Sequence, residues 1–159
     1  MVLVMLGTQN NSFHRLLEEV QKCIDNNIIN EEVIVQAGAT KFQSKDMKFF
    51  KLMPVEELNK YIQQANYIIT HGGVGSIVTS LKMGKKIIAV PRLHKYGEHV
   101  NDHQRQIIET FDGQGFIMGV QNIEDLGNTI KKIPDFNPAV FTSNTQNIIN
   151  IIDEFIENN

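Results

Sequence analysis

The chain has 159 residues, of which 42% are hydrophobic and 21% charged, and its formal net charge is -3. This length suits one domain with its own core and is too short for two ordinary domains. The weak negative charge argues against nonspecific nucleic-acid binding, which requires a basic surface. The single cysteine, Cys23, excludes an internal disulfide and a multi-cysteine zinc site. Because Cys23 falls on the apolar side of a predicted helix, we expect a buried, unreactive thiol.

Apolar runs typical of strands alternate with segments of helical spacing. In chain order, the pattern predicts a strand at 2–6, a helix at 13–24, strands at 33–36 and 49–53, a helix at 54–65, a strand at 67–70, a helix at 76–83, a strand at 86–90, a helix at 101–110, a short strand at 115–118, and helices at 123–133 and 144–157. Ser12 is placed to cap the first helix, Pro54 suits a first helical turn, and Gly84 suits a left-handed helix end. No run approaches the roughly 20 apolar residues that span a bilayer, so we expect a soluble, cytoplasmic protein.

This alternation predicts an α/β fold in which a parallel sheet of about six strands is covered by helices on both faces. We expect a single domain over residues 1–159. Ligands of such sheets bind beyond the carboxyl ends of the strands, near the point where the strand order reverses. The first and fourth strands commonly flank that point. Their exit loops, residues 7–12 and 71–75, are therefore the first candidates for a binding site.

The second of these loops reads His71-Gly72-Gly73-Val74-Gly75-Ser76 and opens a helix. Glycine lets the backbone approach a ligand closely, and the free N–H groups of a helix start favour an anion such as a phosphate. A tight strand-to-helix turn would need glycine for steric reasons alone, and the glycines by themselves leave both interpretations open. The loop is neither a Walker A loop nor a dinucleotide-binding fingerprint, because the spacing differs.

A long polar segment, residues 91–104, follows the fifth strand and is rich in His, Arg, Asn and Gln. His99 and His103 are four residues apart and could share a helix face, as metal ligands do. No third ligand is placed by the pattern, so we expect no metal. Part of the segment has a simpler interpretation, in which Asn101 caps a helix.

The segment THGGVGSIVTSLKMGKKIIAVPRLHKYGEHVNDHQ, together with VMLGTQ near the start, resembles the C-terminal, donor-binding domain of family 28 glycosyltransferases. It looks most like the stand-alone bacterial forms used in capsular or exopolysaccharide synthesis, and like the small subunit of the eukaryotic enzyme that adds the second N-acetylglucosamine to dolichol-linked chitobiose. The resemblance covers nearly the whole chain. It implies a Rossmann-like sheet that forms one half of a GT-B fold.

The resemblance also implies roles for particular residues. The diphosphate of a UDP-sugar would be held by Gly7, Thr8, His71, Gly72, Gly73, Gly75 and Ser76. The backbone near Met53 and Leu58 would meet the uracil. The sugar-side, catalytic set would be Asn101, His103 and Gln104, with Arg92, Glu98 and His99 as further contributors. Relatives usually carry Glu or Asp at the position of Thr79, where the acid holds the ribose hydroxyls. Threonine can hydrogen-bond one hydroxyl but cannot accept from two as a carboxylate does.

A complete GT-B enzyme needs two Rossmann-like domains, and this chain supplies one. The resemblance therefore implies the donor-binding subunit of an inverting UDP-sugar glycosyltransferase. Its partners would be a membrane-anchored acceptor-binding subunit and a lipid-linked saccharide acceptor, and it would be recruited to the inner face of the cell membrane. The UDP-sugar is substrate, so no cofactor is expected. Helix dipoles and hydrogen-bond donors would stabilise the departing UDP, and the acceptor-activating base is expected in the partner.

Two other functions stay open from the sequence. Because Thr79 stands where relatives usually carry an acid, the chain could instead be a noncatalytic nucleotide-binding or scaffolding subunit. A sugar-nucleotide epimerase shares the GT-B layout, but it needs both halves in one chain, and 159 residues count against it. The last predicted helix carries apolar residues over a broad arc, so it either covers the sheet of its own domain or binds the partner. These residues are Ile148, Ile149, Ile151, Ile152, Phe155 and Ile156.

Overall fold

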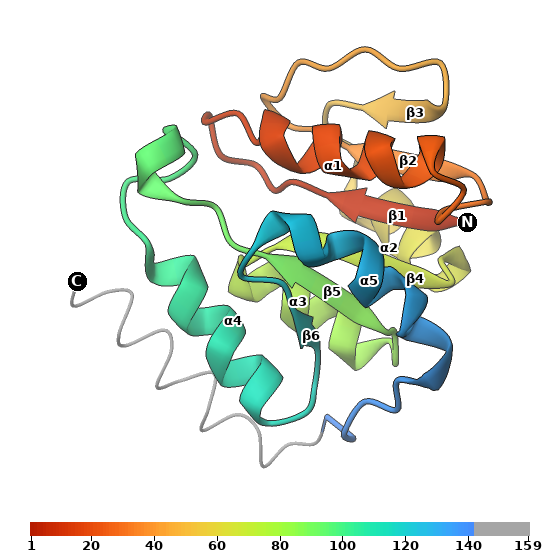
Figure 1. Ribbon diagram of the computed structural model, residues 1–159, viewed down its shortest axis with the longest axis vertical. Coiled ribbons are helices and arrows are strands. Elements are labelled where there is room, and N and C mark those ends of the chain that lie inside the picture. Colours follow the sequence, from red (N-terminus) through yellow and green to blue (C-terminus); the bar gives the residue numbers. More distant parts are fainter. Residues whose placement is uncertain (142–159) are drawn as a thin grey trace.

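The computed structural model describes residues 1–141, and its six strands form one parallel sheet in the order β3-β2-β1-β4-β5-β6 (Figure 1). The predicted α/β fold with a parallel sheet of about six strands is confirmed. The elements are β1 (Val2–Met5), α1 (His14–Asp25), β2 (Val33–Gln36), β3 (Met47–Phe50), α2 (Val55–Gln64), β4 (Tyr67–His71), α3 (Val74–Lys82), β5 (Ile87–Val90), η1 (His94–Tyr96), α4 (His103–Gly113), β6 (Met118–Gly119), η2 (Ile123–Asp125), α5 (Leu126–Lys131) and η3 (Ile133–Asp135).

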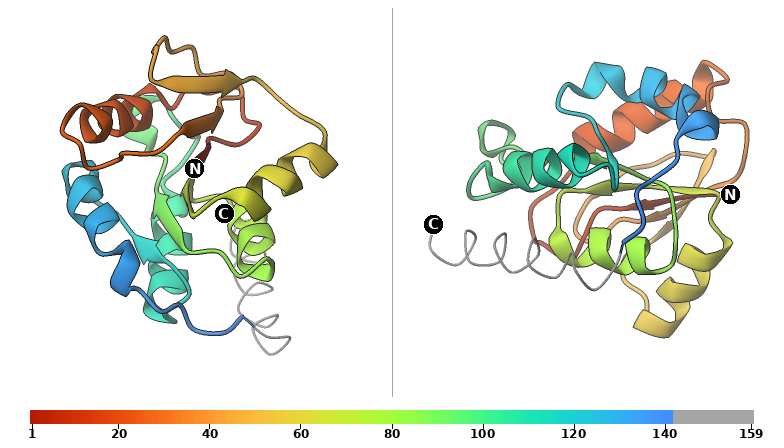
Figure 2. Two further views of the ribbon diagram at one scale, coloured as in Figure 1. Left: turned by 90° about the vertical axis from the view of Figure 1, so that its right-hand side faces the viewer. Right: turned by 90° about the horizontal axis from the view of Figure 1, so that it is seen from below.

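The sheet is buried on both faces. Helices α1 and α5 cover one face, and α2 and α3 cover the other (Figure 2). Successive side chains of a strand point to opposite faces. In β1, Val2 and Val4 pack into the cluster beneath α1 and α5, and Leu3 and Met5 pack into the cluster beneath α2, α3 and α4. This two-sided burial explains why β1 is a continuous apolar run rather than an alternating one.

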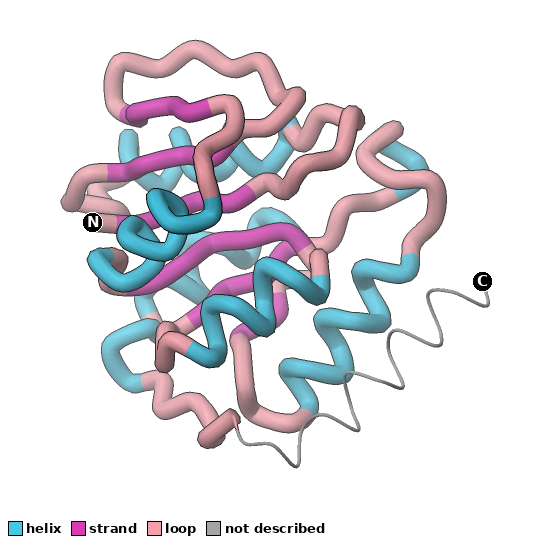
Figure 3. Tube along the Cα trace, turned by 180° about the vertical axis from the view of Figure 1, so that it is seen from behind, coloured by secondary structure: helices cyan, strands magenta, loops and turns pink. Residues whose placement is uncertain are grey.

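The strand order reverses between β1 and β4, which pair directly with Val2 opposite Tyr67. The loops after these two strands therefore leave the sheet side by side. The loop after β5, which carries η1, lies at the same edge, on the right of Figure 3. It is tied to the loop after β1 by a hydrogen bond of 2.9 Å from Nδ2 of Asn11 to the carbonyl of Gly97. The expectation that the first and fourth strands flank the reversal is confirmed.

The third strand begins two residues earlier and ends three residues earlier than predicted, at 47–50 rather than 49–53. It pairs with β2 from Val33 opposite Met47 to Gln36 opposite Phe50. Residues 51–53 therefore run beyond the end of their partner strand. In this edge strand the exposed Lys48 follows the buried Met47, so the apolar pattern begins only at Phe49, where the predicted strand began.

Four helices begin elsewhere than predicted. Helix α3 begins at Val74 rather than at 76, and α2 begins at Val55 with Pro54 as its N-cap. Phe13, not Ser12, precedes the first turn of α1, and the cap position makes no side-chain cap bond. The N–H of Phe13 donates instead to Oγ1 of Thr40, at 2.9 Å. Helix α4 begins at His103 rather than at 101. The expected left-handed turn after α3 is confirmed, since Gly84 has a φ of +72°.

The elements near the end of the described chain are shorter than predicted. The helix expected at 123–133 is α5 flanked by the 3₁₀ turns η2 and η3, and the second turn contains Pro134. β6 spans residues 118–119 rather than 115–118, and Gly115, with a φ of +77°, belongs to the turn that follows α4. The helix predicted at 144–157 lies outside the described residues. Within residues 1–141, none of the helices has the length and apolar character needed to cross a membrane.

Cys23 lies on the buried side of α1 and is 3% exposed. Burial, with a smaller effect from Glu19, raises the pKa of its thiol to about 11. The expectation of a buried cysteine is confirmed, and a raised pKa acts against thiolate formation, which keeps an unreactive thiol as the prediction.

Candidate functional site

Three loops at the strand-order reversal enclose a pocket of about 180 Å³. They follow β1, β4 and β5, so segments far apart in the sequence meet at one place. The lining residues are Gln9, His71, Gly72, Gly73, Val74, His99, Asn101, His103, Gln104 and Ile107. None of these is a carboxylate, which makes the pocket electrostatically compatible with an anion.

At three of the glycines a side chain would clash with neighbouring protein atoms. The imidazole of His71 lies between Gly7 and Gly73, and a Cβ on these residues would stand 2.6 Å from its Nε2 and 2.3 Å from its Cε1, respectively. Gly7 also has a φ of +82°, which favours glycine. A Cβ on Gly72 would stand 2.7 Å from the Cβ of Gln104 in α4. Close packing of the loops therefore accounts for these three positions.

Gly75 is different, because a Cβ at this position would meet nothing within 4 Å. It is the second residue of the nine-residue helix α3, whose N-cap is Gly73 and whose first turn has no side-chain cap bond. The first N–H groups of a helix have no partner inside the helix, and the dipole makes this end positive. The space over Gly75 is thus open to a ligand, and the ligand interpretation of the loop rests on this glycine.

The side chain of Gln104, on α4, joins the loop after β4 to the loop after β5. Its Oε1 accepts hydrogen bonds from the N–H of Gly72, at 2.9 Å, and of Arg92, at 3.0 Å. Its Nε2 lies 3.1 Å from Nδ1 of His71. The sequence placed Gln104 beside the sugar; in the structure its side chain is 3% exposed and engaged with the protein.

Two histidines of the pocket, His71 and His99, lie in an environment that lowers the pKa of the imidazole. Burial, followed by the nearby charge of Arg92, lowers the pKa of His71 to about 3. The same two causes in the same order, with a further effect of His103, lower the pKa of His99. His71 is therefore a neutral ring at neutral pH, able to form hydrogen bonds but not to contribute a positive charge.

Arg92 and Glu98 hold the loops together rather than line the pocket. Arg92 is 1% exposed, and its guanidinium donates to the carbonyls of Leu6, Asn11 and Glu98. Glu98 is 3% exposed and accepts a two-point ion pair from Arg15 of α1, at 3.0 and 2.9 Å. Burial lowers the pKa of Arg92 to about 10, so it stays a cation at neutral pH. The structure thus directs both side chains toward protein atoms, whereas the sequence placed them as ligand contacts.

Asn101, His103 and His99 lie together where α4 begins. The carbonyl oxygen of the Asn101 side chain accepts from the N–H of His103 at 3.0 Å, and the N–H of Asn101 donates to Nδ1 of His99 at 3.3 Å. Asn101 thus accepts from the first N–H of the helix, but the residue at the N-cap is Asp102, which makes no side-chain cap bond. All three residues line the pocket.

The other predicted residues lie outside this lining. Ser76 and Thr79 are half-buried on α3, and Met53 is half-buried in the segment before α2. Thr8 is exposed and lines a neighbouring pocket instead. Gln9 lines both pockets and was not singled out from the sequence, where it appeared only as one polar residue of the first exit loop.

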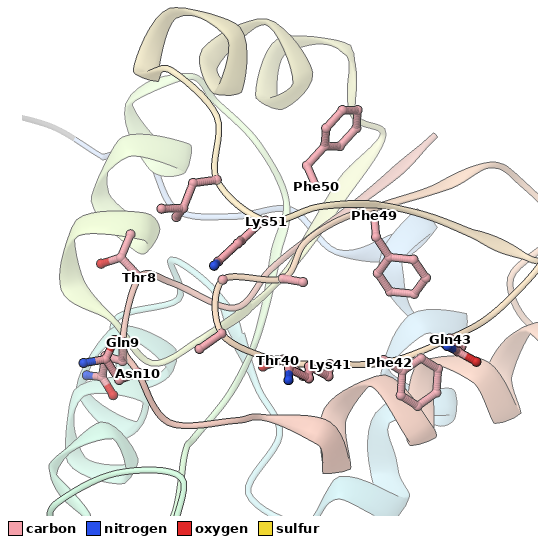
Figure 4. A pocket seen from close by; sticks show the side chains of 14 residues that line it. Thr8, Gln9, Asn10, Thr40, Lys41, Phe42, Gln43, Phe49, Phe50 and Lys51 are labelled. Carbon is pink, nitrogen blue, oxygen red and sulfur yellow. The ribbon is translucent and has the colours of Figure 1, made fainter.

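The neighbouring pocket measures about 670 Å³ and lies at the carboxyl ends of β1, β2 and β3 (Figure 4). Lys51 points into the space between Thr8 and the loop that contains Thr40. Phe42 and Phe49 line the far end, with ring centroids 6.2 Å apart. The larger of the two pockets is therefore not the one built from the predicted residues. The smaller pocket lies where the chemistry-bearing loops meet.

Metal-binding residues do not gather at either pocket. Among residues 1–141, no three or more His, Cys, Asp or Glu side chains come close enough to hold a metal ion. The pair of His99 and His103, which the spacing suggested, is accompanied by the amide residues Asn101 and Gln104 rather than by a third acid, thiol or imidazole.

Comparison with known proteins agrees with this architecture. The sequence model of one protein family, the glycosyltransferase family 28 C-terminal domain, matches residues 1–158 of this chain. The UDP-N-acetylglucosamine transferase subunit ALG13 of Candida albicans is 28% identical over 74 residues, a match that covers 46% of this chain and 24% of that protein. This chain therefore spans about a quarter of the length of the curated relative it matches.

Two solved structures show the same fold. The solution structure of ALG13 has a TM-score of 0.62 and 15% identity, over 95% of this chain and 94% of that one. The crystal structure of MurG from Acinetobacter baumannii has a TM-score of 0.52 and 16% identity, over 95% of this chain and 49% of that one. The fold is thus one half of a GT-B-like architecture, as the resemblance implied. Since the family model covers nearly every residue, the chain belongs to the glycosyltransferase family 28 C-terminal domain family.

Proposed function

We propose that the chain is the donor-binding half of an inverting UDP-sugar glycosyltransferase. The observation that carries this proposal is the open, uncapped start of α3 at Gly75, beside a pocket without carboxylates at the strand-order reversal. An oxygen-rich anion such as a diphosphate suits the N–H groups at such a helix start. The similarity to a subunit of a UDP-N-acetylglucosamine transferase supports a UDP-sugar as the donor.

The smaller pocket would enclose only part of such a donor. Sites for small molecules commonly measure about 300–1,000 Å³, and this pocket measures about 180 Å³. We place the sugar and the adjoining phosphate here, against Asn101 and His103. The nucleoside would continue along α3, past Ser76 toward Thr79 and the backbone near Met53. A second domain facing the carboxyl edge of the sheet would close the site.

The chemistry of this half is electrostatic. As the bond from the sugar to UDP breaks, negative charge grows on the diphosphate, and the dipole of α3 with its free N–H groups stabilises that charge. The base that activates the acceptor hydroxyl comes from the other half. Attack on the face opposite the leaving UDP inverts the anomeric centre, so an α-linked donor gives a β-linked product.

The acceptor half belongs to another chain, which we take to be a membrane-anchored subunit that binds a lipid-linked saccharide. The name of the Candida relative, a transferase subunit, supports a divided enzyme. We further propose that the chain works at the cytoplasmic face of the membrane, in bacterial capsular or exopolysaccharide synthesis. Residues 1–159 would then form one donor-binding domain.

Isothermal titration with UDP tests the donor site directly. We expect saturable binding of UDP and weaker binding of inorganic phosphate, because phosphate alone lacks the contacts along α3. A folded protein that shows no heat of binding with UDP or with UDP-N-acetylglucosamine would remove the proposal. Sugar transfer measured with and without the partner then separates an enzyme from the noncatalytic alternative: binding of UDP with no transfer in the assembled pair would favour the latter.

A further inference from the structure

The orientation of the Gln104 side-chain amide is determined by its surroundings. The atom within 2.9 Å of the N–H of Gly72 and 3.0 Å of the N–H of Arg92 must be an acceptor, because both backbone groups are donors. That atom is the amide oxygen. The opposite orientation would place an NH₂ group against two N–H groups and leave two buried donors without acceptors. The amide nitrogen therefore faces Nδ1 of His71, at 3.1 Å.

This orientation decides where His71 carries its proton. An amide nitrogen can only donate, so Nδ1 of the imidazole must be the acceptor and must be unprotonated. A neutral imidazole with a bare Nδ1 has its proton on Nε2. A charged ring would bring an N–H of Nδ1 against the amide NH₂, so this contact favours the neutral ring, in the same direction as burial.

The remaining neighbours of the ring do not change this assignment. Gly7 and Gly73 flank the Nε2 edge and bring no side chain. The charged and titratable groups that act on His71 are Arg92, after β5, and His99, in the loop before α4, and both disfavour a positive charge on the ring. The hydrogen bond of the ring within residues 1–141 is the one from Gln104, and His71 is part of the pocket lining.

We propose that Gln104 is a positioning residue that fixes His71 as a neutral hydrogen-bond donor, with its Nε2–H directed at an anionic oxygen of the donor substrate. The proposal deepens the donor-site function and rests on it for the identity of the anion. It assigns neither residue as a base: His71 donates a hydrogen bond, and Gln104 acts through His71 and through the N–H groups of Gly72 and Arg92.

The proton position can be measured without any ligand. Two-bond nitrogen–proton NMR spectra of the uniformly labelled chain distinguish a protonated from an unprotonated imidazole nitrogen, and loss of one ring in His71→Gln assigns the signal. We expect the wild-type His71 to carry its proton on Nε2 at pH 7. A ring protonated on Nδ1 overturns the proposal, whether or not the chain binds UDP.

The variant Gln104→Glu tests the positioning role. A carboxylate can accept from both N–H groups and also from His71, so we expect Nδ1 to become protonated, at pH 8 as at pH 7. Gln106→Glu, on an exposed position of the same helix, is the matched control and should leave the His71 spectrum unchanged. A bare Nδ1 in folded Gln104→Glu means that Gln104 does not set the tautomer. If that variant does not fold, the wild-type spectrum still tests whether His71 carries its proton on Nε2.

The donor role of Nε2 is tested by UDP affinity. Glutamine can place an amide N–H near the Nε2 position, whereas leucine fills similar space without a donor. We expect UDP affinity within about fivefold of wild type for His71→Gln, and about 10- to 100-fold weaker for His71→Leu, as for the loss of a hydrogen bond to a charged group. Equal affinity of the two folded variants would show that no hydrogen bond from this position reaches the ligand. Absence of UDP binding in the wild type, with the proton found on Nε2, would instead remove the donor-site function and leave the tautomer assignment standing.

Discussion

The substitution Gly75→Asp should move folding stability and nucleotide affinity in opposite directions. Aspartate has a somewhat higher helix propensity than glycine, and an acid in the first turn interacts favourably with the helix dipole. A Cβ meets nothing within 4 Å, so no clash offsets these gains. Together they predict a stabilisation of about 0.5–1 kcal/mol, or a melting temperature higher by about 1–4 °C.

The same carboxylate would stand where the proposed diphosphate binds. Two unit charges about 6 Å apart repel by roughly 2–3 kcal/mol at the effective dielectric constant of about 20 found near protein surfaces. We therefore expect UDP to bind about 30- to 150-fold more weakly, with the difference shrinking as salt is added. Gly75→Asn, which has nearly the same shape without the charge, should stay within about fivefold of wild type. Isothermal titration and thermal melting of both variants measure these effects; equal UDP affinity of the Asp and Asn variants would refute the phosphate assignment at α3.

Other outcomes follow from the packing around the pocket. Gly73→Ala should lower the free energy of unfolding by about 1–3 kcal/mol, because its Cβ meets the His71 ring at 2.3 Å, while Gly75→Ala should raise it by about 0.5–1 kcal/mol; urea denaturation compares the two. Glu98→Gln should cost about 2–4 kcal/mol in the same assay, because it leaves the buried end of the Arg15 ion pair without its charge. The free energy of unfolding should fall as the pH drops from about 6.5 toward 4, by up to about 1.4 kcal/mol per pH unit, because the unfolded chain binds a proton at His71 near its ordinary pKa of 6.5 while burial lowers the folded pKa to about 3. Denaturation of His71→Asn over the same pH range should show a flatter slope.

The order of the elements and the loops that form the pocket could be predicted from the sequence because both follow from local pattern. Apolar runs alternate with helical spacing, and polar residues follow the strand ends. Contacts between distant segments could not be predicted in this way. The N–H of Phe13 is satisfied by Thr40 rather than by Ser12, since the loop after β2 folds back over the start of α1. The inward turn of Gln104 likewise depends on backbone donors from two other loops.

The glycines of the loop after β4 also show that sequence pattern does not reveal contacts between distant segments. Gly73 and Gly75 are alike in the sequence, two residues apart in one loop. In the structure Gly73 is required because the His71 ring occupies the space of its Cβ, and Gly75 leaves open space above the first turn of α3. Sequence pattern cannot separate the two causes, because one depends on a ring folded back from the preceding strand and the other on the absence of any neighbour. A substitution at Gly73 would therefore report on packing, and only one at Gly75 reports on the ligand.

The contacts around Arg92 determine which part of the site is already in place in this chain alone. Its guanidinium joins the carbonyls of Leu6 and Asn11, on the loop after β1, to that of Glu98, on the loop after β5. The bond to Leu6 is buried and the bond to Asn11 is partly buried, and they join residues separated by 86 and 81 positions in the sequence. Two walls of the pocket are thus held in position without a ligand, and little ordering entropy remains to be lost there on binding. The side above Gly75 has no such restraint. The acceptor-binding half, in the proposed enzyme, would supply the missing wall on that open side.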